Sequence, residues 1–248
     1  MNISFKRYNK DLPYSYSLGV FPTIELLSKR AKHTLGVILH SKGKRNKGLE
    51  KIRFLCEKND IPLTEDDKTI QRIARKGNVY AVGVFEKYHA PLSHNQDHIV
   101  LVNPNGMGNL GTIIRSMLGF GKSNLAIIEP AADYFDPKVI RASMGAIFQL
   151  RLETFGEFAD YWGTYSTHAL YPMLTNGKTS LDEVRFQRPY AIVFGNESSG
   201  LPSEYAQFGT SVRIPQDDGA IDSLNLATSV SIALYQAWIR ETRNFTEK

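Results

Sequence analysis

Two overlapping patterns near the middle of the chain could do chemistry. Gly106 opens a G-x-G-x-x-G pattern, and Asn109 opens an N-x-G-x-x-x-R pattern that ends at Arg115. The apolar run 99–102 predicts a buried strand before them, and apolar residues recur at helical spacing through 110–119. A glycine loop between a strand and a helix presents backbone amides and the positive end of the helix to a polar ligand. The patterns therefore predict a ligand site at a strand–helix junction.

Two later stretches also join polar side chains to loops. In YAIVFGNESSGLP, a predicted buried strand runs into Gly195, followed by Asn196, Glu197 and Gly200. Glycines at a strand end let a ligand approach the backbone closely. In DSLNLA, Ser223 precedes an apolar helical stripe and is suited, like Asp222, to cap a helix. Taken alone, Ser223 indicates only a capped core helix.

The composition argues against several classes of protein. No apolar run approaches the roughly 18 residues of a membrane span. The single cysteine, Cys56, cannot form an internal disulfide and is expected in the core of a cytoplasmic protein. Residues 1–16 lack the apolar segment of a secretory signal. The histidines are scattered without metal-ligand spacing, so no metal site is expected.

The positive charge lies in the front of the chain. The net charge is +5, with a balance of +9 over residues 1–93 and −4 over residues 94–248. Such asymmetry suggests that the front part binds a polyanion, although a solvated basic surface is the alternative. Phosphate contacts are expected from the basic, glycine-rich loop 41–48, through Lys42, Lys44, Arg45 and Lys47.

Helix and strand signals alternate along the chain, which predicts an α/β fold. Residues 1–17 show no period and are expected to be irregular, and the polar stretch 87–97 predicts a linker between domains 1–93 and 97–248. Helices are expected at 22–32, 49–59, 66–76, 110–119, 136–142, 156–163, after Pro202 and at 224–240, and strands at 35–40, 61–64, 79–85, 99–102, 125–128, 147–152, 168–173, 190–194 and 211–214.

The three polar stretches together resemble motifs 1, 2 and 3 of the SpoU/TrmH family of RNA methyltransferases. They read N-x-G-x-x-x-R, F-G-N-E-x-x-G-L and I-P-x-x-x-G-x-x-x-S-L-N-L-A, in family order, and RASMGA at 141–146 resembles a family phrase between motifs 1 and 2. The resemblance covers about 97–240, and the front domain resembles a ribosomal-protein-like substrate-binding domain. The lead-in NPNGMGN departs from the shorter form of many relatives. A dinucleotide-binding dehydrogenase has no reason to carry GNESSGL and DSLNLA, so we treat G-x-G-x-x-G as coincidence.

The resemblance implies a SPOUT-class fold, in which a mostly parallel sheet carries a deep trefoil knot, a rare exception to unknotted connections. It implies a homodimer through the catalytic domain, with RNA as the partner. It also implies methyl transfer from S-adenosylmethionine to a ribose 2′-OH, with rRNA favoured over tRNA. The implied cofactor-binding residues are Phe194, Gly195, Asn196, Glu197, Gly200, Ile214, Pro215, Ser223, Leu224 and Asn225.

The resemblance also assigns catalytic roles to Arg115, Asn109, Glu197, Ser223 and Asn225. In the family the arginine is proposed to activate the ribose hydroxyl. A guanidinium is a poor base, so gripping a phosphate and orienting the 2′-OH is the physically easier role for Arg115. A non-catalytic RNA-binding protein that keeps the fold is the main functional alternative.

Overall fold

The computed structural model describes residues 5–43, 47–74, 78–217 and 222–246, with side chains as far as residue 242. The chain divides into two compact units, one made of residues 1–88 and 133–149 and the other of residues 89–132 and 150–248. The sequence placed a single boundary in the polar stretch 87–97. Segment 133–149, expected in the second domain, instead clusters with the first unit.

The first unit contains a four-stranded sheet in the order β1-β4-β2-β3, with β1 and β2 antiparallel to β4 and β3 parallel to β2. Side chains alternate between its faces, so Val37 packs beside α1 and α2 while Ile38 packs beside α3. The strands are β1 (Tyr14–Leu18), β2 (Thr34–Leu39), β3 (Leu63–Glu65) and β4 (Ala81–Glu86), and the helices are α1 (Val20–Lys29), α2 (Lys47–Lys58) and α3 (Asp67–Ala74).

Strand β1 corrects the expectation of an irregular lead-in through residue 17. Its sequence, YSYSL, alternates aromatic and hydroxyl side chains, so it lacks the apolar signal of a buried strand. Tyr16 is nevertheless fully buried, and so are Ser15 and Ser17. Both serines satisfy their hydroxyls, since Ser15 donates to the carbonyl of Phe135 and Ser17 to that of Gly83.

Segment 133–149 contains α5 (Pro137–Ala142) and a 3-10 helix, Ala146–Gln149. The ring of Phe85 in β4 meets the rings of Phe135 and Phe148, with centroid distances of 5.7 and 5.1 Å. A left-handed residue, Gly145, turns the chain between the two helices. The strand expected at 147–152 therefore begins only at β7 (Arg151–Phe155), after the 3-10 helix.

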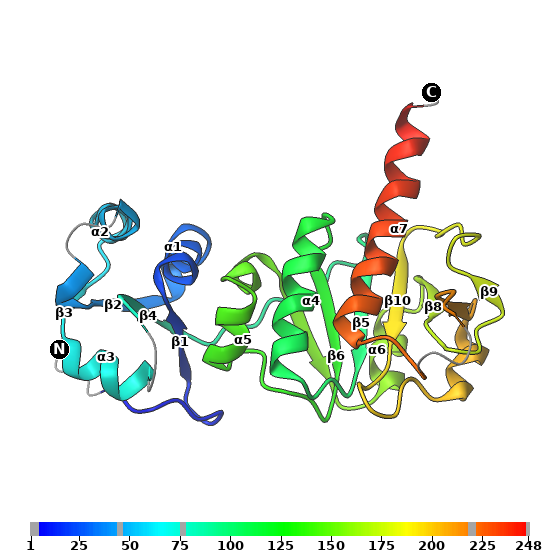
Figure 1. Cartoon of the computed structure of the whole chain (residues 1–248), viewed down its shortest axis with the longest axis horizontal. Coiled ribbons are helices and arrows are strands. Elements are labelled where there is room, and N and C mark those ends of the chain that lie inside the picture. Colours follow the sequence, from blue (N-terminus) through cyan, green and yellow to red (C-terminus); the bar gives the residue numbers. More distant parts are fainter. Residues whose placement is uncertain (1–4, 44–46, 75–77, 218–221, 247–248) are drawn as a thin grey trace. The chain divides into compact units, whose positions relative to one another are not determined.

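The second unit contains a five-stranded parallel sheet in the order β7-β6-β5-β10-β8 (Figure 1). Helices cover both faces, so the central strands are continuously buried, as their apolar runs indicated. The strands are β5 (His98–Val102), β6 (Asn124–Ile128), β7, β8 (Ala169–Pro172) and β10 (Tyr190–Phe194), and the helices are α4 (Met107–Gly119), α6 (Phe158–Thr164) and α7 (Leu226–Thr246).

The region after β8 differs most from the expected elements. A two-residue strand, β9 (Thr179–Ser180), was not expected and pairs with β11 (Val212–Arg213), which is shorter than predicted. The helix expected after Pro202 is a 3-10 helix, Ser203–Phe208. Helix α7 packs on α4, and within the described ranges no helix has the length and apolarity needed to cross a membrane.

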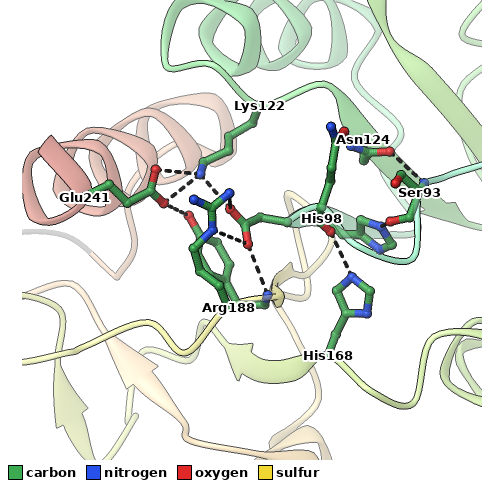
Figure 2. Close-up of polar contacts among 10 residues, drawn as sticks. Ser93, His98, Lys122, Asn124, His168, Arg188 and Glu241 are labelled. Atoms are coloured by element: carbon green, nitrogen blue, oxygen red, sulfur yellow. Dashed lines mark hydrogen bonds and ion pairs between the residues drawn. The ribbon is translucent and has the colours of Figure 1, made fainter. Parts of the chain in front are cut away.

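A buried polar network joins the amino ends of the strands to α7 (Figure 2). The ammonium of Lys122 lies 2.9 Å from Oδ2 of Asp97 and 2.7 Å from Oε1 of Glu241, and Lys122 as a whole residue is 4% exposed. Asp97 also pairs with Arg188, and the hydroxyl of Tyr190 donates to Glu241. Lys122 and Asp97 are buried, whereas Glu241 and Arg188 are partly exposed, so the network matches the buried charges and connects Glu241 of α7 to residues that precede the strands.

Candidate active site

A cavity of about 300 Å³ opens beyond the carboxyl ends of β8 and β10. Its lining comes from residues 173–175 after β8, from residues 194–201 at the end of β10 and in the loop that follows, and from Ile214, Gln216, Ser223, Leu224, Leu226 and Ser229 before and at the start of α7. Ligands of open parallel α/β sheets bind at this end of the strands. The cavity is therefore the candidate ligand site of the second unit.

Most residues that the sequence assigned to a cofactor line this cavity, whereas Pro215 and Asn225 do not. The sequence missed Met173, Leu174 and Thr175, whose position at the end of β8 was the available signal. The other missed lining residues lie close in sequence to predicted ones: Ser198, Ser199, Leu201, Gln216, Leu226 and Ser229. The predicted lining residues found there are Phe194, Gly195, Asn196, Glu197, Gly200, Ile214, Ser223 and Leu224.

The loop after β10 is tightly closed. Asn196 and Gly200 exchange two backbone hydrogen bonds of 3.1 and 2.9 Å, and Gly200 has a left-handed φ of 69°. A Cβ on Gly195 would lie 2.1 Å from the carbonyl carbon of Gly200 and from the amide nitrogen of Leu201. Only glycine fits at position 195, which explains the glycine at the end of this strand.

Glu197 joins this loop to the start of α4. Its carboxylate accepts hydrogen bonds from the amides of Asn105 and Gly106, at 3.0 and 2.8 Å, and from Nδ2 of Asn109, at 3.2 Å. Partial burial alone would raise the pKa of Glu197, but these donors outweigh it and hold the pKa below the usual glutamate value. The side chain is therefore a charged anchor at neutral pH and is poorly suited to accept a proton.

Asn225 extends this group to α7. Its Nδ2 donates to Oδ1 of Asn109 at 3.1 Å, while its own Oδ1 accepts from the amides of Ala227 and Thr228. These contacts identify Asn225 as the N-cap of α7, a position that the sequence assigned to Ser223 or Asp222. Ser223 instead lines the cavity.

Asn103 is a site residue that the sequence missed. It has a left-handed φ of 52°, and its carbonyl accepts a 2.7 Å hydrogen bond from Nδ2 of Asn196. The sequence NPNG, where the first motif differs from many relatives, therefore forms a loop that contacts the second motif, after β10. Because the amide of Gly106 is bonded to Glu197, it is already engaged and does not form the free phosphate cradle of a dinucleotide fingerprint.

Arg115 lies on α4 with its side chain exposed, outside the hydrogen-bonded group of Asn109, Glu197 and Asn225. It forms no hydrogen bond or ion pair with the residues that the structure describes. Such a guanidinium is available to a phosphate. In the first unit, Lys42 and Lys47 are exposed, whereas Lys44 and Arg45 fall outside the described residues.

The arrangement suits a ligand with both polar and apolar parts. Leu201, Ile214 and Leu226 offer apolar surface, and the loop after β10 offers polar groups. No group of three or more His, Cys, Asp or Glu side chains within the described ranges could hold a metal ion.

The fold and the cavity define an α/β protein with a candidate ligand site at the carboxyl ends of its parallel strands. The chain belongs to the SpoU rRNA Methylase family, whose profile matches residues 96–235. It is 30% identical over 65% of its length to a tRNA/rRNA methyltransferase of Synechocystis, and 32% identical over 56% of its length to a 23S rRNA (uridine-2′-O)-methyltransferase of Streptomyces viridochromogenes. The chain spans 60% and 51% of the length of these relatives.

Solved structures extend the similarity to nearly the whole chain. An AdoMet-bound rRNA methyltransferase from Sinorhizobium meliloti is 25% identical, with a TM-score of 0.76 over 91% of this chain and 87% of that one. The SpoU methyltransferase AviRb from Streptomyces viridochromogenes has a TM-score of 0.80 at 21% identity, over 95% of both chains. The expected α/β fold with a mostly parallel sheet is therefore confirmed.

Proposed function

We propose that the protein transfers a methyl group from S-adenosylmethionine to a ribose 2′-OH of structured RNA. The observation that carries the proposal is the cavity beyond β8 and β10, lined by the second and third family motifs and joined through Glu197 to the first. Family membership and the AdoMet-bound relative support it. When bound, the cofactor supplies an electrophilic methyl group on a sulfonium.

The residues of this chain would act by placement. Gly195 and Gly200 bring the backbone close to the cofactor, and Ser223 and Leu224 face it from the segment before α7. Arg115, exposed on α4, would hold an RNA phosphate and orient the attacking hydroxyl. The bond from the ribose oxygen to the methyl carbon forms as the carbon–sulfur bond breaks, and the hydroxyl proton leaves to solvent.

We propose rRNA rather than tRNA as the substrate, because the first unit resembles ribosomal-protein-like binding domains and carries the excess positive charge. Relatives support either class, since one of them methylates cytidine 34 of tRNA. Such RNA is met in the cytoplasm, where we propose that the protein works. We also propose that the C-terminal segment forms the trefoil knot that the resemblance implies.

A second copy of the chain is the proposed protein partner, bound through the second unit. Tyr235 and Trp238 on α7 are 51% and 42% exposed. Their rings meet the ring of Phe120, at the end of α4, with centroid distances of 6.1 and 6.4 Å. Exposed clustered aromatic rings are typical of the centre of a protein interface.

The experiment that tests the activity follows radiolabelled methyl transfer from S-adenosylmethionine to bulk RNA. Arg115→Ala is expected to abolish transfer while cofactor affinity stays within a few-fold. Arg115→Lys keeps the charge but loses the bidentate fork, so it should restore only part of the rate. A wild-type protein that binds RNA without transferring methyl would support the non-catalytic alternative, and a fully active Arg115→Ala variant would refute the arginine's role.

A further inference from the structure

Helix α2 carries an unusual outer face. Lys47, Lys51, Phe54 and Lys58 follow one another at intervals of four, three and four residues. This spacing places all four on one face of the helix. The buried residues of α2 (Leu49, Ile52 and Cys56) lie on the opposite face. We call the four outer residues the α2 face.

The exposed ring of Phe54 is the unexpected member of the α2 face. Phe54 is 62% exposed, and among the described phenylalanines only Phe21 is also largely exposed. Leaving such a ring in water forgoes the free energy that burial would supply, but single exposed rings are common on protein surfaces. What distinguishes Phe54 is that lysines precede and follow it on the same face of the helix.

The three lysines of the α2 face are available to an anion. Lys47, Lys51 and Lys58 are exposed, and among the described residues none of them forms an ion pair. Arg53, on another side of the helix, is by contrast occupied by Glu65 at 2.6 Å. Two acids, Glu50 and Glu57, lie along one edge of the α2 face. Because they repel phosphates, we expect a bound polyanion to follow the lysines and to avoid that edge.

We propose that the α2 face binds an unpaired segment of the RNA substrate, with one base stacked on Phe54 and neighbouring phosphates on the three lysines. The proposal rests on the proposed function, in which RNA is the substrate. It specifies which kind of RNA segment the first unit contacts. An aromatic ring between cations matches a single strand, whose bases have free faces. The bases of a duplex are already stacked on one another, so a duplex offers only its phosphates.

A matched control lies in the same unit. Phe21 on α1 is 66% exposed, so its ring is as available as that of Phe54. On the same face of α1, the residues four and seven positions after Phe21 are Glu25 and Ser28. Phe54 instead has Lys58 four positions after it and Lys47 seven positions before it. A general effect of removing a surface phenylalanine would therefore appear at both positions, and an effect of the α2 face only at Phe54.

The test measures fluorescence anisotropy of the full chain with a labelled oligouridylate and with a duplex of equal length. Phe54→Ala should weaken oligouridylate binding about tenfold, in line with the loss of one stacked base, and should leave duplex binding unchanged. Phe21→Ala should change neither. Lys51→Gln should lower the slope of log affinity against log salt concentration by about 0.7, the value for one phosphate on a single strand.

A direct readout uses Phe54→Trp, which keeps a stacking ring. Its added fluorescence should be quenched by oligouridylate, whereas that of Phe21→Trp should not. Equal binding by wild type and Phe54→Ala, or equal quenching at both positions, would overturn the proposal. So would a change in oligomeric state of Phe54→Ala with unaltered RNA binding, because the α2 face would then be a protein interface.

The proposed function can fail separately. If the wild type transfers no methyl group but binds oligouridylate through Phe54, the activity is wrong and the α2 face stands. If methyl transfer is robust but Phe54→Ala keeps both the wild-type affinity and the wild-type KM for RNA, the α2 face is wrong and the activity stands.

Discussion

The side-chain amide of Asn225 donates to Oδ1 of Asn109 at 3.1 Å, and this bond joins the start of α7 to the start of α4 across 116 residues of sequence. Asn109 in turn donates to Glu197. One residue from each family motif thus belongs to a single hydrogen-bonded chain. The motifs are best understood as parts of one structural unit around the cavity.

The double role of Asn225 predicts two separable losses. Asn225→Ala should lower the free energy of unfolding by about 1 kcal/mol through loss of the α7 cap, and should also weaken cofactor binding. Asn225→Ser keeps an oxygen that can cap α7 but has no amide to donate to Asn109. Relative to Asn225→Ala, it should therefore recover more of the free energy of unfolding than of the cofactor affinity. Chemical denaturation and calorimetry with S-adenosylmethionine measure the two effects. Equal recovery of both by serine would contradict the division.

The glycine at the end of β10 predicts a steric effect. Gly195→Ala would place a Cβ 2.1 Å from backbone atoms of the loop, so the loop must open and cofactor binding should be lost. Gly108→Ala is the matched control, because a Cβ there meets nothing within 4 Å on α4. It should raise the free energy of unfolding by about 0.5 kcal/mol. Calorimetry and thermal denaturation of both variants provide the comparison.

The buried ion pairs of Lys122 predict a large stability effect. Lys122→Met removes the charge that faces Asp97 and Glu241 and should cost about 3 kcal/mol of unfolding free energy. The exposed Lys138 serves as the control, and Lys138→Met should change stability by less than about 0.5 kcal/mol. Urea denaturation near neutral pH measures both. A Lys122→Met protein as stable as wild type would show that the pairs contribute nothing.

His98 predicts a pH dependence of stability. Its ring is fully buried, stacks on His168 at 4.1 Å and contacts the hydroxyl of Tyr161 (Figure 2 shows His98 and His168). Burial lowers the pKa of His98 to about 4, from 6.5 in an exposed histidine. Between these values the unfolded chain binds a proton that the folded chain does not, so stability should fall as the pH drops from 6.5 to about 4.

Replacing His98 with phenylalanine should flatten the stability profile in this range, even if overall stability is lower. His89, whose side chain is 70% exposed, provides the control, and His89→Gln should keep the wild-type slope. Denaturant midpoints at several pH values measure the slopes. An unchanged slope in His98→Phe would assign the acid sensitivity to other groups.

The sequence predicted the parallel sheet and eight of the 17 residues that line the cavity, because continuous apolar runs identify buried strands and because glycines mark their ends. It could not predict β1, since Ser15 and Ser17 are buried with internal hydrogen bonds that no local pattern shows. It also misplaced the cap of α7, because Ser223, Asp222 and Asn225 are all good caps and only the contact with Asn109 selects one.

The contribution of residues 173–175 could not be foreseen from their types, which are ordinary core and loop residues. They reach the cavity because β8 lies beside β10, and strand order is set by long-range pairing. Likewise, nothing in the sequence RASMGA (residues 141–146) indicates that this segment packs in the first unit. Its place depends on Gly145, where a Cβ would lie 2.9 Å from Pro22.

The grouping of residues 133–149 with the front half means that the backbone passes between the two units three times, near residues 88, 132 and 149. No single cut can therefore release either half intact. A fragment starting near residue 90 would expose Phe135 and Phe148, which Phe85 covers in the whole protein, and would be prone to aggregate. Isolating the second unit requires a redesigned bridge in place of residues 133–149, and the two units are best produced together as one polypeptide.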